Sequence, residues 1–149
     1  MSTLPDSGTR DEYATGAVRD GQTGKGRFDL IPFRPQQRIA QHYENGAKKY
    51  SPNNWRLGLP LYRYRDSAAR HLMLAIDDEA AQHLAKDLAA KAQREHFAET
   101  GEVKDFHWGD FYEDHWAAAA WNIIGYMWTE EEISQGRLPY ELASDEGGS

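Results

Sequence analysis

The sequence predicts a single all-α domain, and three observations lead to this fold class. Apolar residues recur at steps of three and four along four segments, which is the spacing of amphipathic helices. The chain shows no convincing strand pattern and no internal repeat. Its 149 residues are enough for one domain with a buried core. The predicted helices span about residues 35–49, 61–79, 80–100 and 114–130.

Composition excludes several classes of protein. A net charge of −7 argues against nonspecific binding to DNA or RNA, which needs a basic face. The chain has no cysteine, so disulfides and cysteine-ligated zinc are excluded. Its first residues lack the features of a signal peptide, and no apolar run approaches the length of a membrane span. We therefore expect a cytoplasmic protein with neither nucleic acid nor membrane as a partner.

The domain is expected to span residues 16–135, between a flexible N-terminus (1–15) and a flexible acidic tail (136–149). Within it, residues 16–32 hold several glycines and are expected to form an ordered, extended loop. The loop carries the cations Arg19, Lys25 and Arg27. By analogy with glycine-rich loops these cations bind an anion, and the alternative is that they are only solvated.

The first helix starts near Pro35, which suits a first helical turn, and runs to about Lys49. Its apolar stripe is Ile39, Tyr43, Ala47 and Tyr50. Glu44 borders this stripe, one turn from Lys48. Gly46 weakens the helix locally, which suggests close packing or a functional approach. Residues 51–60 form a loop by their proline, asparagine and glycine content.

The second helix, 61–79, has an apolar stripe that ends on an acid. The stripe is Tyr64, Ala68, Leu72, Ala75 and Glu79. Asp77, Asp78 and Glu79 fall in the last turn, where the helix macrodipole disfavours negative charge. A divalent cation, a nearby arginine or lysine, or plain solvation would compensate them.

The two remaining helical segments differ in apolar content. Residues 80–100 are alanine-rich with a solvated charged face, and they form either a further helix or an extension of the previous one. His83 and His96 are expected to be exposed rather than metal ligands. Helix 114–130 is strongly apolar and carries two stripes. The predicted core stripe is Trp116, Ala120, Ile123 and Met127. The stripe beside it is His115, Ala119, Asn122 and Tyr126.

Polar side chains border the apolar stripes of three predicted helices. They are Glu44 on the first, Asp66, Arg70, His71 and Glu79 on the second, and Asp114, His115 and Asn122 on the last. Acids that border a core tend to be paired or metal-bound, and carboxylate oxygens suit Mg²⁺ or Mn²⁺. Candidates for holding phosphate are Lys48, Lys49, Arg56 and Arg70; candidates for stacking on a base are Trp55 and Tyr50. These residues alone indicate a helical protein that is a candidate for metal-dependent phosphate chemistry.

Each of these residues also has a purely structural interpretation. The i,i+4 spacing pairs Glu44 with Lys48, and Asp66 with Arg70. His71 and Asn122 are alternatively hydrogen-bonded core residues, and Asp114 is alternatively the N-cap of the last helix. The chain contains no HExxH, Walker or Gly-x-Ser-x-Gly motif.

Several segments resemble the N-terminal domain of the dATP/dGTP diphosphohydrolases of phages and bacteria. In order they are 16–20, 24–30, 42–50, 54–55 with Gly58, 66–71, and His115 with 118–122. That family is related to the MazG-like all-α nucleotide pyrophosphohydrolases. The resemblance implies a MazG-like helical bundle, here with an N-terminal extended loop and a helical insertion.

The resemblance also implies an activity, the hydrolysis of a purine deoxynucleoside triphosphate to the monophosphate and pyrophosphate. It assigns the binding of Mg²⁺ or Mn²⁺ to Glu44, Glu79 and one acid near the last helix. Asp114 is the preferred third ligand, and Asp110 is the alternative. The implied catalytic residues are Glu44, His71 and His115. The implied substrate contacts are Lys25, Arg27, Lys48, Lys49, Asn54, Trp55, Arg70 and Asn122. Such helices are commonly completed by neighbouring subunits, which implies a homodimer or homotetramer.

Two departures from the family pattern leave other activities open. The Gly-Glu pair expected after the second helix is Asp78-Glu79 here, and a much longer segment separates it from the last helix. One alternative is an HD-type dNTP triphosphohydrolase that releases triphosphate whole, although the adjacent His-Asp pair of such sites is absent. The other is a non-enzymatic helical interaction protein whose acids are solvated caps.

Overall fold

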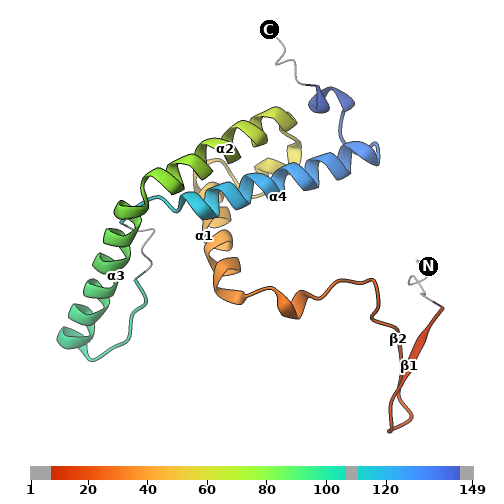
Figure 1. Cartoon of the computed structure of the whole chain (residues 1–149), viewed down its shortest axis with the longest axis horizontal. Helices are drawn as coiled ribbons and strands as arrows, with labels where there is room; N and C mark the ends of the chain where they lie inside the picture. The colour runs from red at the N-terminus through yellow and green to blue at the C-terminus, as the bar shows by residue number, and fades with distance from the viewer. Residues whose placement is uncertain (1–7, 107–110, 145–149) are drawn as a thin grey trace. The chain divides into compact units, whose positions relative to one another are not determined.

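Four α-helices make up most of this computed structural model, which describes residues 8–106 and 111–144 (Figure 1). They are α1 (Phe33–Lys49), α2 (Leu61–Asp77), α3 (Glu79–Thr100) and α4 (His115–Ser134). The predicted all-α class is confirmed, and the helix limits lie within a few residues of the predicted ones. In the described residues, no helix combines the length and the apolar character that crossing a membrane requires.

The N-terminal unit, Met1–Pro32, contains a short β-hairpin that the sequence did not predict. Strand β1 (Arg10–Glu12) pairs antiparallel with β2 (Val18–Asp20), and a 3-10 helix, η1 (Phe28–Leu30), follows. Strands of three residues are too short for an alternating apolar pattern to be recognised. Because both strands are almost entirely exposed, backbone hydrogen bonds rather than a core hold the hairpin.

In the helical unit, Phe33–Ser149, α4 lies along α2 and also contacts α1 (Figure 1). The two helices approach closely at Gly125 of α4, where an added Cβ would stand 2.5 Å from the ring of Tyr64 on α2. Tyr64 is only 1% exposed, and the alanines at 117–119 of α4 are also buried. The core therefore depends on small residues that let the helices come close, more than on large aliphatic side chains.

The predicted second helix is interrupted at Asp78, which separates α2 from α3. The backbone N–H of Asp78 still donates to Leu74, and the side chain of Gln82 donates to the carbonyl of Ala75 (2.8 Å) across the junction. Glu79 consequently lies in the first turn of α3, where the macrodipole favours an acid. The three consecutive acids are thus divided between a helix end and a helix start, and Glu79 needs no compensating cation.

Helix α4 is rotated relative to the prediction from its apolar stripe. Trp116, Ile123 and Met127, predicted as core, are 45%, 53% and 62% exposed. His115 and Asn122, predicted beside the core, are buried at 5% and 6% exposure. Because α4 is apolar around most of its circumference, its sequence did not indicate which side faces the other helices.

Two short 3-10 helices, η2 (Asn54–Leu57) and η4 (Tyr140–Ala143), complete the helical unit. The backbone of Gly58, at a φ of 90°, is approached by Leu138 and Leu142 of the C-terminal segment. An added Cβ there would lie 2.8 Å from Leu142 Cδ1. The loop before α2 is therefore fixed in part by a residue that only glycine suits.

Candidate functional site

A cavity of about 640 Å³ lies among α1, the loop at 51–60, α2 and α4. This volume falls within the roughly 300–1,000 Å³ typical of small-molecule sites. Its aromatic wall includes Tyr43, Tyr50, Trp55 and Trp121. Its polar lining includes His42, Glu44, Asn54, Arg63, Ser67 and Asn122. A wall of rings with a few polar groups suits a planar, partly polar ligand.

The aromatic wall is held together by edge-to-face contacts between elements distant in sequence. The ring of Tyr43 on α1 lies 5.8 Å from Trp55 of η2 and 5.9 Å from Trp121 of α4. Trp55 in turn meets Trp128 at 4.8 Å. Such pairs stabilise a fixed ring arrangement beyond the area they bury. The wall is consequently formed before any ligand binds.

His42 is a half-buried histidine on the cavity wall, with its ring 5.9 Å from that of Trp121. Burial lowers the pKa of His42 below its ordinary 6.5, while the charges of Glu113 and Asp114 oppose this shift. His42 is therefore mainly neutral at neutral pH. A neutral imidazole can accept a proton from water, which is the property of a general base.

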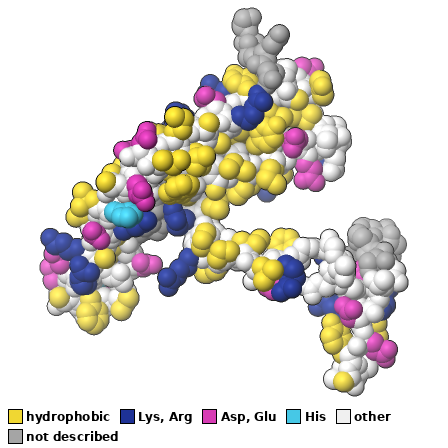
Figure 2. Space-filling view, viewed as in Figure 1, with side chains coloured by type: hydrophobic (Ala, Val, Ile, Leu, Met, Phe, Trp, Pro, Cys, Tyr) yellow, Lys and Arg dark blue, Asp and Glu magenta, His cyan; other side chains and the backbone are white. Residues whose placement is uncertain are grey.

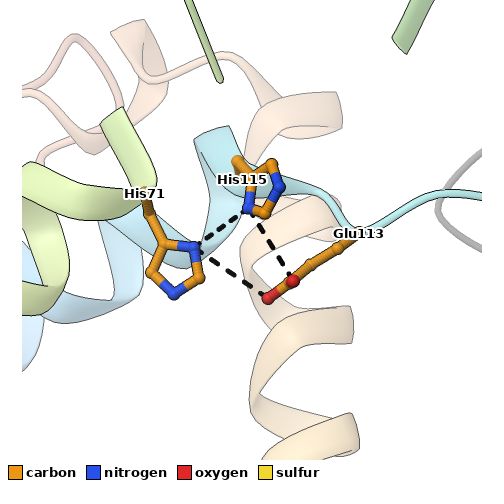
Figure 3. A group of neighbouring side chains, drawn as sticks. All are labelled: His71, Glu113 and His115. Atoms are coloured by element: carbon orange, nitrogen blue, oxygen red, sulfur yellow. Dashed lines mark hydrogen bonds and ion pairs between the residues drawn. The ribbon is translucent and has the colours of Figure 1, made fainter. Parts of the chain in front are cut away.

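A second cluster joins His71 of α2 to Glu113 and His115 at the start of α4 (Figure 3). The two Nδ1 atoms are 3.0 Å apart. Glu113 Oε1 is 3.9 Å from His71 Nδ1, and Glu113 Oε2 is 3.8 Å from His115 Nδ1. Both histidines are largely buried, whereas the Glu113 side chain is 58% exposed. Burial lowers the pKa of His71, with Glu113 opposing and the charge of Arg70 adding to the shift.

The residues on either side of Glu113 are anchored by other helices. Asp114 accepts two hydrogen bonds from Arg38 of α1, at 2.7 and 2.8 Å, and caps α4 by accepting from the N–H of Ala117 (3.0 Å). Tyr112 donates to Asp78 at the end of α2, and this hydrogen bond raises the pKa of Tyr112 to about 12. The short segment that carries Glu113 is thus fixed to both α1 and α2.

The structure brings some of the sequence-predicted site residues together. Glu44, Asn54, Trp55 and Asn122 all line the cavity. His71 and His115 meet in the second cluster. Asn122 is buried and donates to the carbonyl of Ala118 at 2.8 Å.

The three acids expected to share a cation have separate partners. Glu44 pairs with Lys48 at 2.8 Å, which lowers the pKa of that carboxyl. Glu79 is exposed and stands 3.9 Å from His83. Asp114 is paired with Arg38, and Asp110 lies outside the described residues. Among residues 8–106 and 111–144, the one group of three acids or histidines close enough to share an ion is His71, Glu113 and His115.

The predicted phosphate-binding cations occupy different surroundings. Lys48 is bound to Glu44, and the ammonium of Lys49 lies 5.0 Å from the ring centre of Tyr50. Arg70 donates to the hydroxyl of Ser67 at 3.4 Å. In the N-terminal unit, Lys25 contacts Asp20 and Arg27 contacts Asp29. Arg63, which the sequence did not single out, lines the cavity.

The sequence also did not single out His42 or Glu113. His42 stands one residue before Tyr43 of the predicted stripe, so its position on the inner side of α1 was a usable signal. Glu113 carries no periodic signal, because it precedes α4 and reaches His71 only through the anchoring of Tyr112 and Asp114.

Comparison with known families supports the resemblance seen in the sequence. A family model described as "dATP/dGTP diphosphohydrolase, N-terminal" matches residues 15–137, which contain all four helices, the cavity and the histidine cluster. No curated protein and no solved structure was found to match the chain.

Proposed function

We propose a function for this chain on the basis of its family, since the chain belongs to the dATP/dGTP diphosphohydrolase N-terminal family. The proposed reaction is the hydrolysis of dATP or dGTP to the deoxynucleoside monophosphate and pyrophosphate. The observation that carries the proposal is the aromatic cavity, whose volume of about 640 Å³ suits a nucleotide.

The purine is proposed to lie against the aromatic wall. Trp55, Tyr43 and Trp121 present ring faces and edges that a planar base can contact. Asn54 and Asn122 lie at the same cavity, and amide side chains offer both a donor and an acceptor to a base edge. This arrangement supports recognition of a base rather than of the phosphates alone.

The phosphates are proposed to lie toward the cationic side chains. Arg63 lines the cavity, and Lys48 and Lys49 end α1, between the lining residues Ala47 and Tyr50 in the sequence. Guanidinium and ammonium groups stabilise the negative charge on phosphate oxygens. Arg70, Lys25 and Arg27 stay as further phosphate contacts expected from the resemblance.

His42 is the proposed acceptor of the proton from the attacking water. The water oxygen forms a bond to a phosphorus of the triphosphate chain while the P–O bond to the departing pyrophosphate breaks, and the water proton passes to the imidazole of His42. His71 and His115 remain the residues that the resemblance assigns to orienting groups or moving protons. Glu44 remains a predicted catalytic residue on the same cavity wall.

A divalent cation, Mg²⁺ or Mn²⁺, is part of the proposal, and when bound it would neutralise phosphate charge and activate water. The expected ligands do not fit this role in the described part of one chain, because Glu44, Glu79 and Asp114 have separate partners. We propose that further carboxylates come from a second chain in the homodimer or homotetramer that the resemblance implies.

The test is a screen of all deoxynucleoside and ribonucleoside triphosphates with the purified protein and Mn²⁺ or Mg²⁺, separating the phosphate products. We expect pyrophosphate and the monophosphate from dATP or dGTP. Release of intact triphosphate would instead identify the HD-type reaction. A clean preparation that hydrolyses no nucleotide with either ion would contradict both enzymes and favour the interaction protein.

A further inference from the structure

We infer that His71, Glu113 and His115 form a site for a divalent transition-metal ion of the Zn²⁺, Ni²⁺ and Fe²⁺ class, and that this site discriminates against Mg²⁺. The inference does not rest on the proposed function, because ion binding is measured without nucleotide. It begins from the convergence of three ligand atoms that come from two helices and the segment before the second (Figure 3).

When both histidines are neutral, the protons within the cluster do not satisfy all of its electron-rich atoms. If His71 and His115 are neutral, one N–H hydrogen lies between the two Nδ1 atoms at 3.0 Å. At least one of these nitrogens then presents a lone pair, yet a carboxylate oxygen of Glu113 stands 3.8–3.9 Å from each. Three electron-rich atoms facing a single proton are poorly satisfied, whereas a cation would be attractive to all three.

The distances suit a metal ion after a small movement of one side chain. Ligand atoms bonded to an ion at about 2.0–2.2 Å stand roughly 3.0–3.5 Å from one another. The two nitrogens already meet this requirement at 3.0 Å. Glu113 must approach by less than about 1 Å, and its 58% exposed side chain has room to do so.

The surroundings hold the three ligands in place. Arg38 fixes Asp114 between Glu113 and His115, and Asp78 fixes Tyr112 on the other side of Glu113. The ring of Tyr112 also lies edge-on to His115 at 5.4 Å. Supporting contacts of this kind are what orient ligands in metal sites. The nearby charge of Arg70 opposes a cation, but Arg70 is exposed to solvent, which screens it.

The ligand types decide which ion binds. Imidazole nitrogen suits Zn²⁺, Ni²⁺ and Fe²⁺, whereas Mg²⁺ prefers a shell made of oxygen. Three protein ligands leave further coordination positions open, as in catalytic rather than structural metal sites. The expected preference is therefore Zn²⁺ over Mn²⁺, and Mn²⁺ over Mg²⁺.

The test is isothermal titration calorimetry of the metal-stripped full chain near neutral pH, with ZnCl₂ and separately with MgCl₂. We expect one Zn²⁺ per chain, not displaced by excess Mg²⁺. His71→Gln and Glu113→Gln are expected to weaken Zn²⁺ binding by at least about 10–100-fold, the size of effect seen even for outer partners of metal ligands. Circular dichroism checks that each variant folds. If His71→Gln does not fold, the Glu113→Gln variant decides the test, because the Glu113 side chain is exposed.

The matched controls are two exposed side chains of α3, His83 and Glu95, at 67% and 62% exposure. His83→Gln and Glu95→Gln are expected to bind Zn²⁺ as the wild type does. Absence of Zn²⁺ binding, equal affinity for Mg²⁺, or wild-type Zn²⁺ affinity in Glu113→Gln would each overturn the inference. Each of these outcomes is measured without nucleotide, and the product screen tests hydrolysis separately.

Discussion

At the scale of single residues, His42 stands between the cavity and the histidine cluster. It lines the cavity, and its charge is coupled to Glu113, Asp114 and His71. Its half-buried ring is therefore exposed to the cavity and interacts electrostatically with the cluster. Trp55 also lines the cavity, and its ring contacts those of both Tyr43 and Trp128.

His42 is predicted to make the protein less stable in mild acid. Its pKa is lowered by burial from an ordinary 6.5, so the unfolded chain takes up the proton first as pH falls. The stability associated with neutral His42 is fully present above pH 6.5 and is lost as pH falls through the lower folded pKa. Urea unfolding at several pH values should show that the free energy of unfolding falls less in acid for His42→Gln than for the wild type. His83→Gln, at an exposed position, is the control, and an equal loss in His42→Gln and wild type would refute the prediction.

Trp55→Ala is predicted to weaken nucleotide binding. Stacking of a base on an aromatic ring contributes about 1–3 kcal/mol, so KM for dATP or dGTP should rise by roughly 5–150-fold. Steady-state pyrophosphate release measures this. Tyr140→Ala removes a 79% exposed ring outside the cavity lining and should leave KM unchanged. An unchanged KM in Trp55→Ala would place the base elsewhere.

At the scale of elements, the contact between α2 and α4 depends on glycine at one position. The ring of Tyr64 lies where a Cβ on Gly125 would be, at 2.5 Å from Cε1 and 3.0 Å from Cζ. Gly46 on α1 differs, because an added Cβ there meets nothing within 4 Å. The sequence suggested two roles for Gly46, close packing or the close approach of another group for function. The open space contradicts close packing, and the position of Gly46 on the cavity wall agrees with the second role.

Gly125→Ala is predicted to destabilise the protein although alanine favours helices. Overpacking costs about 1–3 kcal/mol, and the gain in helix propensity is about 1 kcal/mol, so a net loss of up to about 2 kcal/mol is expected. Gly46→Ala, the same change without a clash, should raise the free energy of unfolding by about 0.5–1 kcal/mol. Both are measured by urea denaturation. A stabilised Gly125→Ala variant would show that the ring of Tyr64 moves aside without lowering the free energy of unfolding.

At the scale of the whole helical unit, α2 and α4 expose an apolar face. It includes Leu72, Met73 and Ile76 of α2, and Trp116, Ile123 and Met127 of α4. Figure 2 shows hydrophobic side chains gathered over these helices. Ile123 lies about 200° around α4 from Trp121, which faces the cavity. The apolar face is therefore on the other side of α4 from the proposed substrate site.

A second copy of the chain is the occupant we predict for this face, since the resemblance implies a dimer or tetramer and exposed apolar patches commonly mark such contacts. Size-exclusion chromatography with light scattering should give a dimer or tetramer for the wild type. Ile123→Glu, which buries a charge in the contact, should give a monomer. Leu57→Glu, at a 78% exposed site outside the face, should leave the assembly intact. A monomeric wild type would refute the prediction.

The sequence by itself determined the helices and their order, because apolar spacing is local information that each segment carries alone. It also determined the family, through strings of residues spread over most of the chain. Trp55 and Asn122, which it predicted as substrate contacts, line the cavity. It did not determine the rotation of α4, since a helix that is apolar on most sides fits a core in several orientations.

Tertiary packing alone decided which polar groups meet. His71 and His115 are 44 residues apart, and they touch because Tyr64 and Gly125 set the approach of α2 to α4. Glu113 joins them because contacts from two other helices hold its neighbours, which no spacing within one helix encodes. Of the three acids expected to share a cation, Glu44 and Glu79 have partners one turn away on their own helices. Only Asp114 gains its partner, Arg38 of α1, from the packing. Local patterns specify elements, whereas the convergence of a site depends on distances between elements that only the folded chain fixes.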